Sequence, residues 1–98
     1  MTYQFAASSG ADADISLIVR WYLNIDPKLA FRFLIETKTV LRRIIRMPYS
    51  FPRWAGPFRR AQLNRFPYFI YYSVEMDIVT VIAVLHQRRS DTTPIGRG

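Results

Sequence analysis

The sequence predicts an α+β fold in which a helical hairpin packs on one face of a mainly antiparallel sheet, in the order β-α-α-β-β-β. Apolar residues recur at helical spacing through residues 15–44 and at the two-residue spacing of strands through residues 58–86. Proline and glycine separate the two regions. A helix pair with one apolar stripe needs one sheet face to cover it, so we expect two layers.

The N-terminal part predicts a strand followed by a helix. The strand is expected at Thr2–Ala7 and is broken by the serines and glycine after it. Ser9 or Asp12 is the expected helix cap, and Asp12 and Asp14 fall in the first turn, where the helix dipole favours negative charge. The buried face follows the i, i+3, i+4, i+7 pattern in Ile15, Ile18, Val19 and Tyr22.

A second helix is predicted to begin at Asp26-Pro27, because aspartate caps helices and proline fits the first helical position. Its apolar residues keep helical spacing from Ala30 to Ile44, and Met47-Pro48 ends it. The short link between the helices predicts an antiparallel hairpin. Basic residues lie outside the apolar stripe at Lys38, Arg42, Arg43 and Arg46.

Residues 49–57 (YSFPRWAGP) predict an irregular connection that Phe51 and Trp54 hold to the body. Three strands are expected after it, at Phe58–Arg65, Pro67–Glu75 and Ile78–His86. The middle strand alternates, so Tyr68, Ile70, Tyr72 and Val74 share one face, and Phe69, Tyr71, Ser73 and Glu75 the other. Arg59 and Arg60 are adjacent on a strand, so their side chains should point to opposite faces.

Length and composition fit one domain at residues 1–89, followed by a flexible tail at 90–98. The absence of cysteine excludes disulfides and thiolate metal sites. The longest apolar runs are only strand-length and no secretory signal precedes them, so a cytoplasmic protein without a membrane segment is expected. We find no phosphate-binding glycine loop and no metal-ligand cluster, and we expect no cofactor and no metal.

Positive charge is concentrated in the middle of the chain. Fourteen Lys/Arg against seven Asp/Glu give a net charge of +7. No acidic residue lies between Thr37 and Val74, whereas the basic ones there are Lys38, Arg42, Arg43, Arg46, Arg53, Arg59, Arg60 and Arg65. Such a segment attracts polyanions or acidic protein segments. The alternative is a basic surface that only keeps the protein soluble.

The three-strand segment, FRRAQLNRFPYFIYYSVEMDIVTVIAVLHQRR, resembles the RelE/ParE superfamily of toxins from type II toxin–antitoxin modules. The resemblance rests on Arg65–Tyr68 (RFPY), the Tyr/Val strand after it and Leu85–Arg89 (LHQRR), and it covers residues 3–89. It implies a growth-arresting toxin that a cognate acidic antitoxin neutralises in a hetero-oligomer.

The superfamily contains RelE-like members, which cut mRNA on the ribosome, and ParE-like members, which inhibit DNA gyrase. RNA cutting needs basic groups at the scissile phosphate and an acid/base. By the resemblance, Arg60 holds a family basic position, but Gln62 and Phe69 stand where many nucleases carry basic residues, and the tail has no tyrosine or histidine. The LHQRR ending resembles ParE. We therefore expect a ParE-like gyrase inhibitor, with a RelE-like endonuclease and a non-toxic degenerate interaction domain as alternatives.

The resemblance and the basic segment together suggest candidate site residues. The catalytic candidates are His86, Arg60 and Arg88, and the alternative for His86 is a strand-end residue that hydrogen-bonds to a neighbour. The expected target-binding residues are Arg60, Arg65, Arg88 and Arg89. The expected antitoxin-binding residues are Arg42, Arg43, Arg46 and Arg59. Tyr68, Tyr71 and Tyr72 fit core packing better than stacking on bases.

Overall fold

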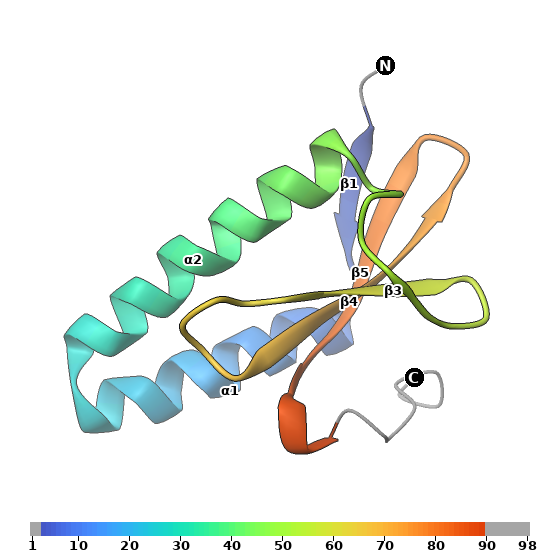
Figure 1. Cartoon of the computed structure of the whole chain (residues 1–98). Helices are drawn as coiled ribbons and strands as arrows, with labels where there is room; N and C mark the ends of the chain where they lie inside the picture. Colours follow the sequence, from blue (N-terminus) through green and yellow to red (C-terminus); the bar gives the residue numbers. More distant parts are fainter. Residues whose placement is uncertain (1–2, 90–98) are drawn as a thin grey trace.

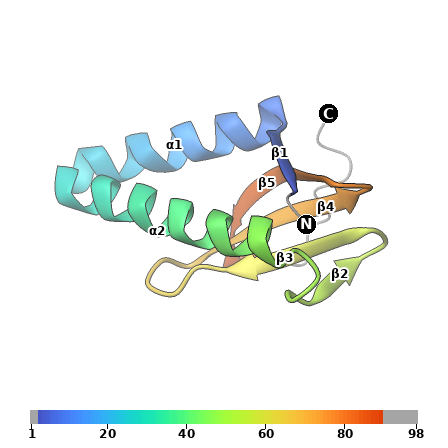
Figure 2. The same cartoon turned by 90° about the horizontal axis from the view of Figure 1, so that it is seen from above.

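The computed structural model describes residues 3–89 and consists of a helical hairpin laid across one face of a sheet (Figures 1 and 2). The elements in chain order are β1 (Gln4–Ala7), α1 (Ser9–Ile25), α2 (Pro27–Arg46), β2 (Arg53–Ala55), β3 (Phe58–Gln62), β4 (Tyr68–Glu75), β5 (Ile78–His86) and a 3₁₀ turn, η1 (Gln87–Arg89). The predicted fold class is confirmed. The tail expected at 90–98 lies outside the described residues.

The five strands are ordered β1-β5-β4-β3-β2. β1 runs parallel to β5, and all the other neighbours are antiparallel. Figure 2 shows both helices on the same side of this sheet, so the opposite face of the sheet carries no helix.

The strands differ from the prediction in four places. β1 begins at Gln4 rather than at Thr2, and Tyr3 before it is not part of the strand. The connection at 49–57 contains β2, which pairs with β3 and is too short to show an alternating pattern. β3 ends at Gln62 rather than at residue 65, and β4 begins at Tyr68 rather than at Pro67. Residues between them form a turn in which the Tyr68 amide donates to the Phe66 carbonyl.

The helix ends follow local capping chemistry. Asp26 caps α2 through its side chain, which accepts a hydrogen bond from the Lys28 amide, and Pro27 follows at the first position as predicted. The cap of α1 is Ser8, whose hydroxyl accepts from the Ala11 amide, so the prediction of Ser9 or Asp12 was wrong. Asp14 lies beyond the first turn and is buried, which also corrects the prediction.

The main core lies between the hairpin and the sheet. At its centre Phe33 is fully buried and packs edge-on against Phe66, with ring centroids 5.6 Å apart. Tyr22 joins them from α1. Burying such rings stabilises the fold by about 1.5–3 kcal/mol each. The predicted alternation of β4 is confirmed, because Ile70 and Tyr72 belong to this core.

A second, smaller cluster covers the face of the sheet that has no helix. Tyr71, Ala83 and Leu85 are buried there, with Trp54, Phe69 and Ile82 packed against them. Trp54 reaches this cluster from β2, and its ring centroid lies 5.0 Å from that of Tyr71. Within the described chain, the Tyr71 hydroxyl is buried without a hydrogen-bond partner.

Candidate interaction surface

The basic residues of α2 gather at its C-terminal end. Arg42, Arg43 and Arg46 are exposed, and Arg43 and Arg46 occupy the last turn, where the helix dipole favours positive charge. The Arg43 guanidinium lies 5.8 Å from the centroid of the Phe51 ring, which packs on the main core. Arg43 is therefore held on the helix-covered side of the sheet, beside the edge.

Arg60 approaches the same place from the opposite face. Its guanidinium stacks 4.2 Å from the centroid of Phe69, a member of the open-face cluster. Arg43 and Arg60 line one cavity of about 440 Å³, whose other walls are Phe51, Pro52, Gln62, Asn64 and Phe69. The structure thus brings together two arginines that the sequence analysis had assigned to different surfaces.

Arg59 points to the other face than Arg60, as predicted. Its guanidinium donates to the carbonyl oxygen of Phe51 at 2.7 Å and to that of Tyr49 at 3.4 Å. The Tyr72 hydroxyl holds the same loop, since it donates to the carbonyl oxygen of Pro48 at 2.6 Å. Burial raises the pKa of Tyr72 to about 12, and Arg59 opposes this shift. Arg59 and Tyr72 fix the loop after α2.

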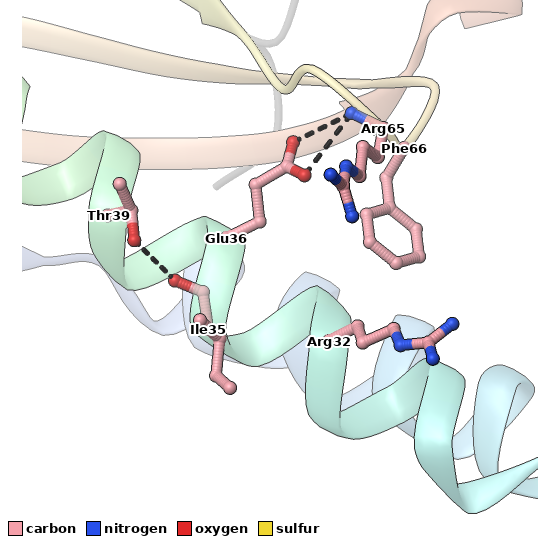
Figure 3. A pocket seen from close by; sticks show the side chains of 6 residues that line it. All are labelled: Arg32, Ile35, Glu36, Thr39, Arg65 and Phe66. Atoms are coloured by element: carbon pink, nitrogen blue, oxygen red, sulfur yellow. Dashed lines mark hydrogen bonds between the residues drawn. The ribbon is translucent and has the colours of Figure 1, made fainter.

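Arg65 lies in a different cavity, between α2 and the β3–β4 turn (Figure 3). Its backbone amide donates to both carboxylate oxygens of Glu36, at 3.2 and 3.0 Å. Arg32, on the preceding turn of α2, lines the same cavity. Arg65 and Arg32 therefore line a cavity that also contains an acidic group, apart from the cavity that Arg43 and Arg60 line.

Of the three catalytic candidates, His86 and Arg88 lie next to each other, and Arg60 lies apart from them. His86 packs edge-on against Tyr68, at 5.3 Å, and Tyr68 belongs to the helix-covered core. The Nδ1 atom of His86 accepts a hydrogen bond from the Arg88 amide at 3.1 Å. Arg60 lies on the other face of the sheet, in contact with Phe69. Arg88 is exposed in η1, and the Arg89 side chain lies outside the described part.

The aromatic supports of the two cavity arginines were missed by sequence reasoning. Phe69 lies diagonally across the strand pair from Arg60, because Gln62 pairs with Phe69 and Arg60 with Tyr71. The contact between Arg60 and Phe69 could therefore have been predicted only with the pairing register of β3 and β4 in hand. Phe51 belongs to a loop, and no sequence pattern places it under Arg43.

Within residues 3–89, none of the helices is long and apolar enough to cross a bilayer. The same range contains no cluster of three or more His, Cys, Asp or Glu that could hold a metal ion.

Comparisons with known proteins identify one family by sequence and one solved structure of the same fold. The family model described as the ParE toxin of the type II toxin-antitoxin system, parDE, matches residues 7–91. The solved structure of the chromosomal ParDE TA system from P. aeruginosa contains a chain of the same fold, with a TM-score of 0.77 and 15% sequence identity. The alignment covers 87% of this chain and 96% of that one. No curated protein matches the sequence.

Proposed function

The chain belongs to the ParE toxin family of type II toxin–antitoxin systems, and from this premise we propose that it arrests growth by inhibiting DNA gyrase until a cognate antitoxin neutralises it. The family match over residues 7–91 carries the proposal. The cell compartment implied by that target is the cytoplasm.

The arrangement of the catalytic candidates supports gyrase over mRNA as the target. A nuclease needs its acid/base and its phosphate-binding group at one reacting centre. His86 and Arg60 lie on opposite faces, and Gln62 and Phe69 offer no charge beside Arg60. We propose that the target contacts Arg60, Arg65, Arg88 and Arg89 through charge and shape rather than through chemistry.

The antitoxin is proposed to be an acidic protein that binds the basic end of α2. Arg42, Arg43 and Arg46 are exposed and free to pair with carboxylates. Arg59 serves this surface indirectly, since its guanidinium holds the loop carbonyls of Tyr49 and Phe51. The antitoxin would then neutralise the toxin by covering basic side chains that the target would otherwise contact.

The test is induction of the gene alone and together with the adjacent reading frame. Induction alone should reduce the number of colony-forming cells, and co-expression should restore it and yield a complex by pull-down. Purified chain should inhibit supercoiling of relaxed plasmid DNA by gyrase. Unchanged viability would favour a degenerate domain, and mRNA cut at codon-defined positions would favour the RelE-like alternative.

A further inference from the structure

Three cavities follow one another along the loop that joins α2 to β2 (Figure 2), and neighbouring cavities share lining residues. The first has a volume of about 420 Å³ and shares Arg46 with the second, of about 300 Å³. The second shares Arg43 with the third, of about 440 Å³, which Arg60 also lines. Together they form one basic groove, which is lined in order by Arg46, Tyr49, Arg43, Phe51, Arg60 and Phe69.

Each cavity of the basic groove contains an aromatic ring beside its arginine. The Arg43 guanidinium lies 5.8 Å from the centroid of Phe51, and that of Arg60 lies 4.2 Å from the centroid of Phe69. In the first cavity the ring is that of Tyr49, which is 57% exposed. The groove therefore presents a positive charge next to a flat apolar group three times in succession.

Negative charge is missing from the basic groove. Among the described residues that line its three cavities, none is acidic. The sequence has no acidic residue between Thr37 and Val74, the segment that supplies all three arginines. Like charges in a groove focus the electric field and concentrate ions of the opposite sign there. The groove therefore fits a ligand that carries several negative charges at intervals.

The loop that carries two of the rings is already fixed by two side chains. Arg59 donates to the carbonyl oxygens of Tyr49 and Phe51, and its guanidinium lies 5.2 Å from the centroid of the Tyr49 ring. The Tyr72 hydroxyl donates to the carbonyl oxygen of Pro48 in the same loop. A ligand that binds an ordered surface loses less free energy in ordering it. The rings are therefore preorganised for stacking.

We propose that the basic groove binds single-stranded DNA. The phosphates would pair with the three arginines, and the bases would stack on Tyr49 and on the guanidinium groups that lie over Phe51 and Phe69. The choice of DNA over RNA rests on the proposed function, because gyrase acts on DNA. The site itself goes beyond that function, because it belongs to the isolated chain.

An acidic peptide is the other ligand that carries several negative charges, and the antitoxin is proposed to bind two of the same arginines. Glutamate and aspartate side chains supply charge but no flat surface, so they would leave the three rings unused. Bases stack on aromatic rings whatever their sequence, since each base has a flat face. The alternation of arginine and ring therefore favours a nucleic acid strand in this groove.

The test measures the fluorescence anisotropy of labelled ligands titrated with the full chain at low salt. The first ligand is an octathymidylate, and the second is an octamer of abasic deoxyribose phosphates, which has the same charges and no bases. Stacking should make the first bind at least about tenfold more tightly than the second. An octaglutamate peptide with the same label should also bind at least about tenfold more weakly than the octathymidylate.

Aromatic variants isolate the stacking contribution. Tyr49→Ala should weaken binding of the octathymidylate about tenfold and leave binding of the abasic strand unchanged, which also shows that the variant is folded. Tyr49→Phe keeps the ring and should bind like the parent. Phe31→Ala is the matched control, because Phe31 is 65% exposed on α2 outside the three cavities and should change neither affinity.

Arginine variants isolate the phosphate contribution through its salt dependence. With about three phosphates neutralised, the logarithm of the association constant should fall against the logarithm of salt concentration with a slope of about −2. Arg43→Ala with Arg60→Ala should reduce the slope to about −0.7. Arg20→Ala with Lys28→Ala removes two exposed charges of the helical hairpin outside the cavities and should leave the slope near its parent value.

Equal affinity for the octathymidylate, the abasic strand and octaglutamate would overturn the proposal, since charge alone would then explain binding. So would an unchanged affinity in Tyr49→Ala. Octauridylate bound about tenfold more tightly than octathymidylate would assign the groove to RNA instead. A chain that inhibits gyrase without preferring strands with bases keeps the proposed function and loses this proposal. A chain that binds octathymidylate as expected without affecting gyrase or viability does the reverse.

Discussion

On each side of the sheet, a short outer strand pairs with only part of its neighbour: β1 with part of β5, and β2 with part of β3. The remaining parts of β5 and β3 differ in what covers them. β1 covers β5 only from Ile78 to Val81, and beyond that point the side chains of α1 take over. The Ser8 hydroxyl donates to the Ile82 carbonyl at 3.2 Å, and Asp14 accepts from the Val84 amide at 2.9 Å. No described side chain does the same for Gln62 on β3. One edge is closed by the chain itself and the other is left open.

The two edges show two ways of protecting an unpaired strand from pairing with another molecule. Unpaired strand edges pair with copies of themselves unless charge or shape prevents it. Closing the β5 edge requires a buried carboxylate, since Asp14 is only 7% exposed. Beside the β3 edge, Arg43 of α2 and Arg60 of β3 line one cavity, and their like charges oppose pairing with a second copy of the chain. The positive charges beside this edge therefore take the place of a covering side chain as protection against self-association.

Hydrogen exchange measures the contrast directly and carries the largest expected effect. The Val84 amide is buried and bonded, so its exchange requires opening of the structure. The Gln62 amide points to a free edge. We expect Gln62 to exchange at least about a thousandfold faster than Val84 in the free chain. Similar protection at both amides would mean that the β3 edge is closed.

Removing the cap of β5 should make that edge behave like β3. Asp14→Ala leaves the buried Val84 amide without its acceptor and should lower the free energy of unfolding by about 2–3 kcal/mol in urea titrations. Asp12→Ala is the matched control, because Asp12 is exposed in the first turn of the same helix and should cost less than about 1 kcal/mol. Equal losses in both variants would contradict the edge-capping role.

The sequence predicted the elements whose signals are local. Asp26-Pro27 marks the start of α2, and the alternation around Tyr72 indicates which face of β4 is covered. The role of Asp14 was not predictable, because its partner Val84 lies 70 residues away and next to an irregularity in β5. Read locally, an acidic residue near a helix start indicates only a dipole effect.

The candidate site was predicted only in part for the same reason. The sequence indicates that Arg59 and Arg60 face opposite ways, which the structure confirms. Which of them faces the helices depends on the register of the sheet and on the loop that Arg59 binds. The opposite placement of His86 and Arg60 likewise requires the faces of two different strands to be known.

The attachment of the loop after α2 to Tyr72 can be tested through pH. Tyr72 has its pKa raised to about 12, so its neutral form is favoured in the folded chain. Its contribution to stability is full below about pH 10, the ordinary tyrosine value, and is lost as pH rises toward 12. Tyr72→Phe should cost about 1 kcal/mol at pH 7 and make the decline above pH 10 shallower. An unchanged alkaline slope would show that the hydroxyl is not held under the loop.

The smallest effect on folding is expected from the two arginines beside the β3 edge. Arg43 and Arg60 interact with the protein mainly through exposed faces of Phe51 and Phe69, and such contacts contribute about 0.5–1 kcal/mol each. Removing each side chain also relieves repulsion between two like charges. The double variant Arg43→Ala, Arg60→Ala should therefore unfold within about 1 kcal/mol of the parent in urea, far less than Asp14→Ala. A loss as large as that of Asp14→Ala would mean that the arginines close the β3 edge structurally, and the two edges would then be alike.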